Sequence, residues 1–278
     1  MKLLFSPTSV AEARVTLDSP VDVIDIKNPD EGSLGCQHPV VAAAIVDLAH
    51  GAGREVSIAI GDLHHQPGTA AMAAFAAAQL GADYVKAGLR GSATVPEAKD
   101  LLQWIVESIR MVRCGNVRAN LAEGSGDTWP DHPFTGNSRV SPTEGENFPT
   151  GDKPWVVACG YADHLRFGGL SPQEVLSAAV MAQCDYVMLD TLTKDGLTLF
   201  DHLTRREVGE FCASAHSQGL KVALAGSLQV EHLPALAEMQ PDFIGVRGAI
   251  CENSNRGGAI CPHRTRAFAD AATVASRS

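Results

Sequence analysis

The sequence lacks several features that would place the protein in common functional classes. No apolar run approaches the roughly 18 residues of a membrane span, and the opening MKLLFSPTSV holds too short an apolar run for a signal peptide. Neither a P-loop nor a GxSxG motif is present. We therefore expect neither a membrane protein nor a secreted one, and neither of the two enzyme classes that these motifs mark.

Basic residues are in the minority, because 22 Lys and Arg face 32 Asp and Glu, for a formal net charge of −10. This balance argues against a nucleic-acid partner but leaves room for a local basic pocket. The seven cysteines include no CxxC pair, so we expect reduced thiols and a cytoplasmic location. Cys251, Cys261 and His263 lack tetrahedral zinc spacing, and the adjacent His64 and His65 rarely chelate one ion, so no metal is expected.

What the chain does contain is a regular alternation of apolar runs and helical segments. The strands are predicted at 2–5, 21–26, 56–60, 84–87, 155–158, 186–189, 222–225 and 243–246. Strands alternating with helices indicate a parallel sheet, and eight such units in 278 residues predict a (β/α)8 TIM barrel as a single domain, 1–278. A doubly wound open sheet is the alternative, but no GxGxxG motif follows the first strand.

One segment, residues 114–153, does not fit this alternation. It is rich in Gly, Pro, Asn, Ser and Asp, and about forty residues without periodicity is long for a barrel connection. It joins the fourth helix, predicted at 96–111, to the fifth strand, which places it on the N-terminal face of the barrel. We interpret it as a loop-rich insertion, disordered or used for contacts in a homo-oligomer.

The stretch DVIDIKNPDEGSLG, residues 22–35, combines a buried strand with charge. Asp25 and Lys27 are two residues apart, so their side chains point to the same side of the strand. A carboxylate and an amine at the end of an apolar strand are costly to bury unless they pair. Their position before a glycine-containing loop is typical of a catalytic site in a barrel, with a structural ion pair as the alternative.

Charged residues recur at the C-terminal ends of the even-numbered strands. They are Asp25, Lys27, Lys86, Asp190 and Arg247, with Lys194 on the loop after strand six. Inward side chains from alternate strands share layers in a barrel, so these groups are expected to converge. A lysine that is crowded by cations and partly desolvated has a lowered pKa and can form a Schiff base with a carbonyl. Nearby carboxylates can then transfer protons.

The loops after strands seven and eight are a frequent phosphate-binding place in this fold. Here they carry Gly226, Ser227, Arg247 and Gly248. Glycines let backbone N–H groups approach an anion closely, which favours a phosphorylated substrate. Ordinary turn chemistry is the alternative reading of these glycines.

Several stretches together resemble the (5-formylfuran-3-yl)methyl phosphate synthase family of methanofuran biosynthesis. They read DVIDIKNPDEGSLG, AIGD, GADYVKAGL, ACGYAD, LDTLTKDG, ALAGS and GVRGA. The resemblance covers nearly the whole chain apart from 114–153. It implies a (β/α)8 lyase that condenses two glyceraldehyde 3-phosphate molecules into 4-(hydroxymethyl)-2-furancarboxaldehyde phosphate, with loss of phosphate and water and with no cofactor or metal.

The resemblance also implies roles for individual residues. Lys27, in the DIKNP stretch, corresponds to the Schiff-base lysine, and Asp25 to the aspartate two residues before it. Lys86 corresponds to the proton acceptor of the DYVK motif, and Asp190 and Lys194 to the charged pair of LDTLTKDG. Two alternatives stay open: a Schiff-base aldolase for another phosphosugar, and a non-catalytic barrel that binds a phosphometabolite.

Overall fold

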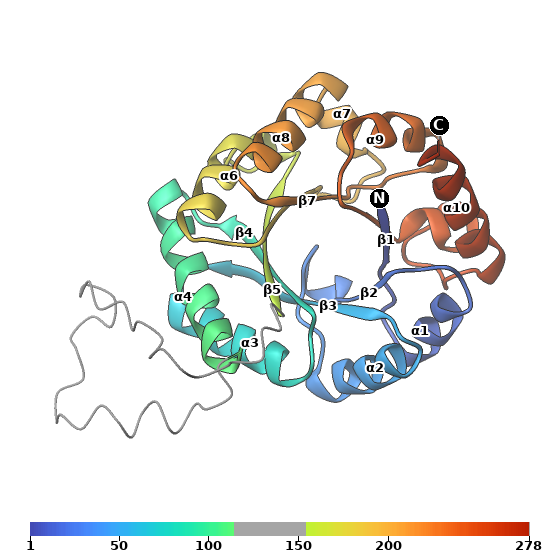
Figure 1. Ribbon diagram of the computed structural model, residues 1–278, viewed down its shortest axis with the longest axis horizontal. Helices are drawn as coiled ribbons and strands as arrows, with labels where there is room; N and C mark the ends of the chain where they lie inside the picture. The colour runs from blue at the N-terminus through green and yellow to red at the C-terminus, as the bar shows by residue number, and fades with distance from the viewer. Residues whose placement is uncertain (114–153, 278) are drawn as a thin grey trace, which may run out of the picture.

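The computed structural model describes residues 1–113 and 154–277, in which eight parallel strands close into a barrel in sequence order, β1 to β8 (Figure 1). The strands are β1 Lys2–Phe5, β2 Val23–Ile26, β3 Glu55–His64, β4 Tyr84–Gly91, β5 Trp155–Tyr161, β6 Tyr186–Asp190, β7 Lys221–Leu224 and β8 Phe243–Val246. The predicted (β/α)8 barrel is therefore confirmed. The interpretation of residues 114–153, between α4 and β5, lies outside the described residues.

Helices surround the barrel in Figure 1 and cover its outer face. They are α1 Val10–Leu17, α2 Pro39–Gly51, α3 Pro67–Gln79, α4 Val95–Arg113, α6 Pro172–Met181, α7 Leu199–His202, α8 Arg205–Ser217, α9 Leu233–Met239 and α10 Pro262–Ala275. Ser171 and Thr204 cap α6 and α8, each in a capping box with the glutamate three residues later. These side chains accept hydrogen bonds from N–H groups that a helix start leaves unpaired.

Some predicted boundaries were wrong. Strand β3 continues to His64, where the prediction ended at Ile60, and β4 continues to Gly91. The extra residues pair with each other across register shifts, with Asp62 opposite Gly88 and His64 opposite Gly91. The prediction ended these strands where polar residues and glycines begin, because such residues end most strands. Here the extended parts of β3 and β4 lie side by side and pair each other's backbone N–H and C=O groups.

The apolar residues form two cores, one on each side of the sheet. The outer core, between strands and helices, includes Ile24, Ile26 and Leu101. The inner core fills the barrel, and at its N-terminal end Tyr84 contacts Tyr186 and Phe243 with ring centroids 5.4 and 5.5 Å apart. This aromatic packing fills the N-terminal half of the barrel, so that the larger cavities lie at the two ends of the barrel.

An aspartate precedes every even-numbered strand and fixes its register against the strand before it. The carboxylates of Asp22, Asp83, Asp185 and Asp242 each accept a 2.8 Å hydrogen bond from the N–H of Leu3, Val56, Val156 and Val222, in that order. The main-chain carbonyl of each aspartate also accepts from the first residue of the next strand around the ring. These four aspartate clamps extend the DYV repeat at 83–85 and 185–187 to a fourfold pattern.

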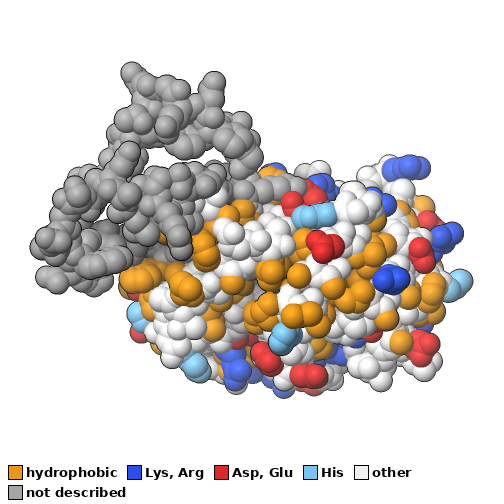
Figure 2. Space-filling view, turned by 90° about the horizontal axis from the view of Figure 1, so that it is seen from below, with side chains coloured by type: hydrophobic (Ala, Val, Ile, Leu, Met, Phe, Trp, Pro, Cys, Tyr) orange, Lys and Arg blue, Asp and Glu red, His pale blue; other side chains and the backbone are white. Residues whose placement is uncertain are grey.

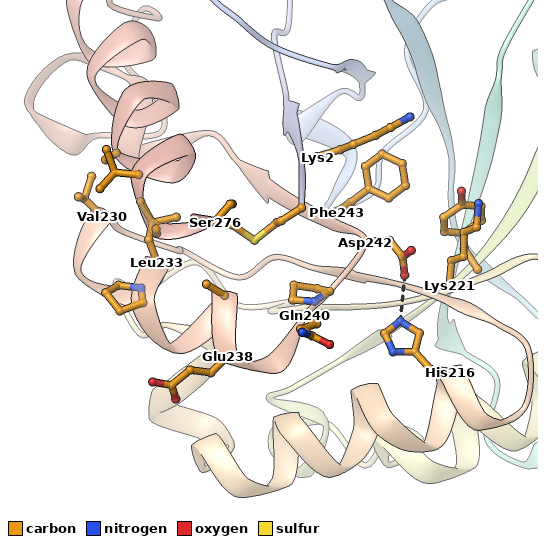
Figure 3. Close-up of a pocket in the computed structure, with 18 residues that line it drawn as sticks. Lys2, His216, Lys221, Val230, Leu233, Glu238, Gln240, Asp242, Phe243 and Ser276 are labelled. Atoms are coloured by element: carbon orange, nitrogen blue, oxygen red, sulfur yellow. Dashed lines mark hydrogen bonds and ion pairs between the residues drawn. The ribbon is translucent and has the colours of Figure 1, made fainter. Parts of the chain in front are cut away.

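A cavity of about 1190 Å³ lies at the N-terminal mouth of the barrel (Figure 3). Lys2 and Phe243 lie side by side there, and His216 is bonded to Asp242 at 3.0 Å. The Lys221 amine lies 5.7 Å from the Trp155 ring centroid. Lys2, Lys221 and Asp242 are therefore held by internal contacts, and this cavity lies at the mouth opposite to the strand ends that carry the predicted site.

On the described part of the face in Figure 2, acidic and basic side chains are interspersed with apolar ones. Among residues 1–113 and 154–277, we find no helix both long and apolar enough to span a membrane. The same residues contain no cluster of three or more His, Cys, Asp or Glu side chains that could hold a metal ion.

The aspartate clamps can be tested on Asp185. Asp185→Ala should lower the free energy of unfolding by about 1–3 kcal/mol, because the Val156 N–H loses its carboxylate acceptor. Asp47→Ala, at an exposed site on α2, should change it by less than about 0.5 kcal/mol. Thermal unfolding followed by circular dichroism measures both. Equal effects of the two changes would contradict the stabilising role of the clamp.

Candidate active site

The even-numbered strands carry the predicted charged residues into the C-terminal half of the barrel. Counting from each aspartate clamp, Asp25 and Lys86 occupy one inward layer and Lys27 and Asp190 the next. All four side chains are buried. The structure therefore brings together the residues that the sequence singled out, and their neighbours decide whether charge can persist there.

Asp25 lies at the base of this group, fully enclosed. Its carboxylate forms ion pairs with Lys86 and, at 3.8 Å, with the Lys27 amine, and it accepts a 2.8 Å hydrogen bond from the Ser6 hydroxyl. Burial works against ionisation, but the charges of Lys86 and Lys27 outweigh it and lower the pKa of Asp25. Asp25 is therefore a carboxylate that joins the two lysines.

Asp190 holds the other side of Lys27. One of its oxygens lies 3.9 Å from the Lys27 amine, and the other accepts a 2.7 Å hydrogen bond from the Lys194 amine. Burial opposes the charge, yet Lys194 and Lys27 lower the pKa of Asp190 well below its usual range. The buried groups thus form a chain of alternating charge: Lys86, Asp25, Lys27, Asp190, Lys194.

Lys27 is the central member of the chain. Burial lowers the pKa of its amine to about 8, with Lys86 and Lys194 acting in the same direction and Asp190 and Asp25 opposing them. The sequence argument named both crowding cations and removal from water, and of the two, removal from water contributes more. A substantial fraction of neutral amine near neutral pH is what a nucleophilic lysine requires.

The loop after β2 folds over the site. The Asn28 N–H donates to the Gly35 carbonyl, and a Cβ on Gly35 would lie 2.1 Å from the Asn28 carbonyl, so the closure requires glycine. Ser33 donates to the Thr191 carbonyl at 3.2 Å, and Leu34 is fully buried in the inner core. This loop shields Lys27 from bulk water on one side.

A cavity of about 330 Å³ opens beside Lys27 and reaches the predicted phosphate loops. Its lining includes Lys27, Asp190, Lys194, Gly226, Ser227, Arg247, Gly248 and Arg256. Gly226 has φ of +105°, and a Cβ there would lie 3.0 Å from the Thr191 side chain. The hydrogen bonds of the described residues include none donated by the backbone N–H of Ser227 or Gly248. A small phosphorylated molecule fits this volume and composition.

The structure places Arg247 differently from a simple phosphate ligand. Its guanidinium donates to the Glu12 carboxylate and to the Ser6 carbonyl, both at 2.8 Å. It also donates at 2.8 Å to the carbonyl of Arg256, a residue that the sequence argument did not select. Arg247 borders the cavity, but most of its donors already have protein partners.

Sequence reasoning also gave little weight to a pair on β3 and β5. The Tyr161 hydroxyl donates to the Asp62 carboxylate, and a Cβ on Gly88 would collide with that carboxylate at 2.0 Å. Burial raises the pKa of Asp62, although Tyr161 opposes the rise. Their sequence separation hid the contact; the glycine two residues after Lys86 was the available signal.

The fold and the site together define a class of protein. It is a (β/α)8 barrel with a buried chain of lysines and carboxylates and a small polar cavity at its C-terminal mouth. Comparisons with known proteins are more specific. A family model described as 4-HFC-P synthase matches residues 3–122 and 142–269. The (5-formylfuran-3-yl)methyl phosphate synthase of Methanopyrus kandleri is 39% identical over 271 residues, covering 97% of this chain and 98% of the relative. The enzyme of that name from Archaeoglobus fulgidus is 38% identical, covering 91% of each.

The chain belongs to the (5-formylfuran-3-yl)methyl phosphate synthase family. Solved structures support the fold alone. Orotidine 5'-phosphate decarboxylase from Pyrococcus horikoshii superposes with a TM-score of 0.57 at 13% identity, covering 98% of this chain and 99% of that one. A 3-hexulose-6-phosphate synthase gives 0.53 at 16% identity, covering 99% of each.

The charge chain predicts how Lys27 titrates. Its reaction with a small acylating reagent should rise with pH and reach half its limiting rate near pH 8, because only the neutral amine reacts. Asp190→Asn should move that midpoint to lower pH, since Asp190 raises the pKa of Lys27. Mass spectrometry of the Lys27 peptide measures the rate. A midpoint that rises in Asp190→Asn would contradict the assigned direction.

Proposed function

We propose that the protein is a lyase that condenses two glyceraldehyde 3-phosphate molecules into 4-(hydroxymethyl)-2-furancarboxaldehyde phosphate, with loss of phosphate and water, for methanofuran-type cofactor biosynthesis. The observation that carries the proposal is Lys27, buried between Asp25 and Asp190 with a pKa of about 8. Family membership supports the product class. A cytoplasmic location and a homo-oligomer are parts of the same proposal.

Lys27 acts as the nucleophile. Its neutral amine attacks the aldehyde of one triose phosphate, and loss of water gives an iminium. The iminium withdraws electrons and makes the adjacent C–H acidic, which a free aldehyde does more weakly. Asp25 and Asp190, on either side of the amine, stabilise the positive charge that develops on it.

Proton transfer is assigned to the two lysines that are linked to Lys27 by a shared carboxylate. Lys86 is paired with Asp25, and in its neutral form its amine can accept the proton when the C–H bond breaks, which turns it into the ammonium that Asp25 stabilises. Lys194 plays the matching part beside Asp190. The residues assigned to catalysis are Lys27, Lys86, Asp25, Asp190 and Lys194.

Phosphate is bound at the other end of the cavity. Gly226, Ser227 and Gly248 offer backbone N–H groups, and Arg247 borders the same loops. Neither the family resemblance nor the residues around Lys27 call for a cofactor or a metal in this scheme. Fixing the phosphate at these loops places the aldehyde end of a triose toward Lys27.

Borohydride trapping tests the nucleophile. Reduction in the presence of glyceraldehyde 3-phosphate should leave a stable added mass on the peptide that contains Lys27, and Lys27→Ala should abolish both the adduct and turnover. Lys27→Arg should do no better, because a guanidinium stays protonated. Lys221→Ala, at the opposite mouth, is the control and should trap normally. An adduct on Lys86 or Lys194 instead would overturn the role of Lys27.

The role of Lys86 is tested separately. Lys86→Ala should lower turnover by roughly 10²–10⁴-fold, the usual contribution of general acid–base catalysis, while trapping at Lys27 persists. Furan absorbance and phosphate release follow turnover. If furan never forms but another aldehyde is joined to the trapped triose, the Schiff-base aldolase is supported; absence of any turnover with triose phosphates supports a binding protein.

A further inference from the structure

We propose that Arg256, in the loop after β8, is the side chain that binds the substrate phosphate, and that Arg247 is a positioning residue that holds this loop in place. The inference rests on the proposed function, since it identifies the group that selects a phosphorylated aldehyde over an unphosphorylated one. It assigns to Arg256 a contact that the sequence pattern placed on Arg247.

Arg256 is a half-buried cation that borders the same cavity as Lys27, Ser227 and Gly248. Within residues 1–113 and 154–277, the hydrogen bonds and ion pairs include none made by its guanidinium. Asp190 acts on Arg256 electrostatically across the cavity but forms no ion pair with it. A partly desolvated guanidinium with no carboxylate at ion-pair distance is costly unless an anion completes the site. Its five N–H donors suit the oxygens of a phosphate.

Arg247, in contrast to Arg256, makes its hydrogen bonds to other groups of the protein. Its side chain is 8% exposed, and its donors go to Glu12 and to the main-chain carbonyls of Ser6 and Arg256. The Glu12 carboxylate neutralises its charge, and the bond to the Arg256 carbonyl fixes the loop backbone. Arg247 therefore determines where the Arg256 guanidinium stands.

A second arginine supports the same loop from behind. Arg264, on α10, donates to the Ala249 carbonyl at 3.1 Å and to the Ser254 hydroxyl. Asn253 and Ser254 adopt left-handed backbone conformations with φ of 53° and 55°, which non-glycine residues rarely adopt without outside support. Two arginines thus hold a strained loop so that the third, Arg256, lines the cavity.

The charge balance around the cavity favours an anion at this end. Lys27, Lys86 and Lys194 surround two carboxylates, Asp25 and Asp190, while the Arg247 charge is matched by Glu12. Arg256 adds positive charge with no further carboxylate at its side of the cavity. A phosphate dianion would offset this excess, and Ser227 and Gly248, whose N–H groups could bind it, line the same cavity.

The test compares Arg256→Gln and Arg256→Lys with the unaltered protein. Arg256→Gln should weaken binding of inorganic phosphate, measured by calorimetry, by roughly 10- to 100-fold, as expected for a charge-assisted hydrogen bond. Arg256→Lys should recover part of this loss, because it keeps the charge but not the paired donors. The melting temperature of both variants should stay close to that of the unaltered protein.

Trapping kinetics supply a readout that a merely structural role would not move. In Arg256→Gln, the glyceraldehyde 3-phosphate concentration that gives half-maximal borohydride trapping at Lys27 should rise by a similar factor. Trapping of unphosphorylated glyceraldehyde should be unchanged. Arg247→Gln should instead lower the melting temperature, because it leaves the partly buried Glu12 carboxylate without its ionic partner.

Two results would overturn the proposal: a phosphate affinity in Arg256→Gln equal to that of the unaltered protein, or a half-maximal trapping concentration of glyceraldehyde 3-phosphate that does not rise in Arg256→Gln. Failure of the proposed function would be recognised separately. In that case neither aldehyde forms an adduct with the unaltered protein, whereas the calorimetric loss of inorganic phosphate binding in Arg256→Gln still reports on Arg256.

Discussion

The structure depends on the alternation of charge inside the barrel mouth. A lone ammonium or carboxylate could not be removed from water there without losing its charge. In the chain from Lys86 to Lys194, each carboxylate touches two lysines, so both carboxylates stay ionised despite complete burial. The pKa of Lys27 is lowered to about 8, because burial acts on its amine more strongly than its two carboxylate neighbours do. Reactivity at one residue therefore follows from the arrangement of five.

The barrel makes this arrangement possible by separating its layers. Aromatic rings fill the N-terminal end, charged groups follow above them, and polar loops close the top. Small residues make room between the charged ones: Gly88 admits the Asp62 carboxylate, and Gly226 approaches Thr191. The aromatic rings keep water away from the N-terminal side of the Lys27 amine. The dielectric around this amine is therefore set by the protein interior on that side and by the cavity on the opposite side.

Much of this could be predicted from the sequence, and the reason is periodicity. Alternating strands and helices predicted the closed barrel, and the two-residue spacing of Asp25 and Lys27 predicted a shared face. What the sequence did not indicate depends on contacts between distant parts of the chain. The ion pair between Arg247 and Glu12, for example, joins residues 235 positions apart. The Tyr161–Asp62 contact spans 99 positions, and the extension of β3 and β4 needed both strands together. A local sequence pattern does not indicate which distant residues will pair.

The aspartate clamps have a consequence for how the chain reaches its native state. The carboxylate bond of each clamp joins residues only 19 to 29 positions apart, so its loop closes at small entropic cost. The two strands that it joins can therefore align while the rest of the chain is still unfolded. The bond from the Lys2 N–H to the Asp242 carbonyl is different, because it joins the two ends of the ring. Sealing the barrel is then a late event that joins units already in register, and a chain still being synthesised would hold most of its strand order before β8 emerges.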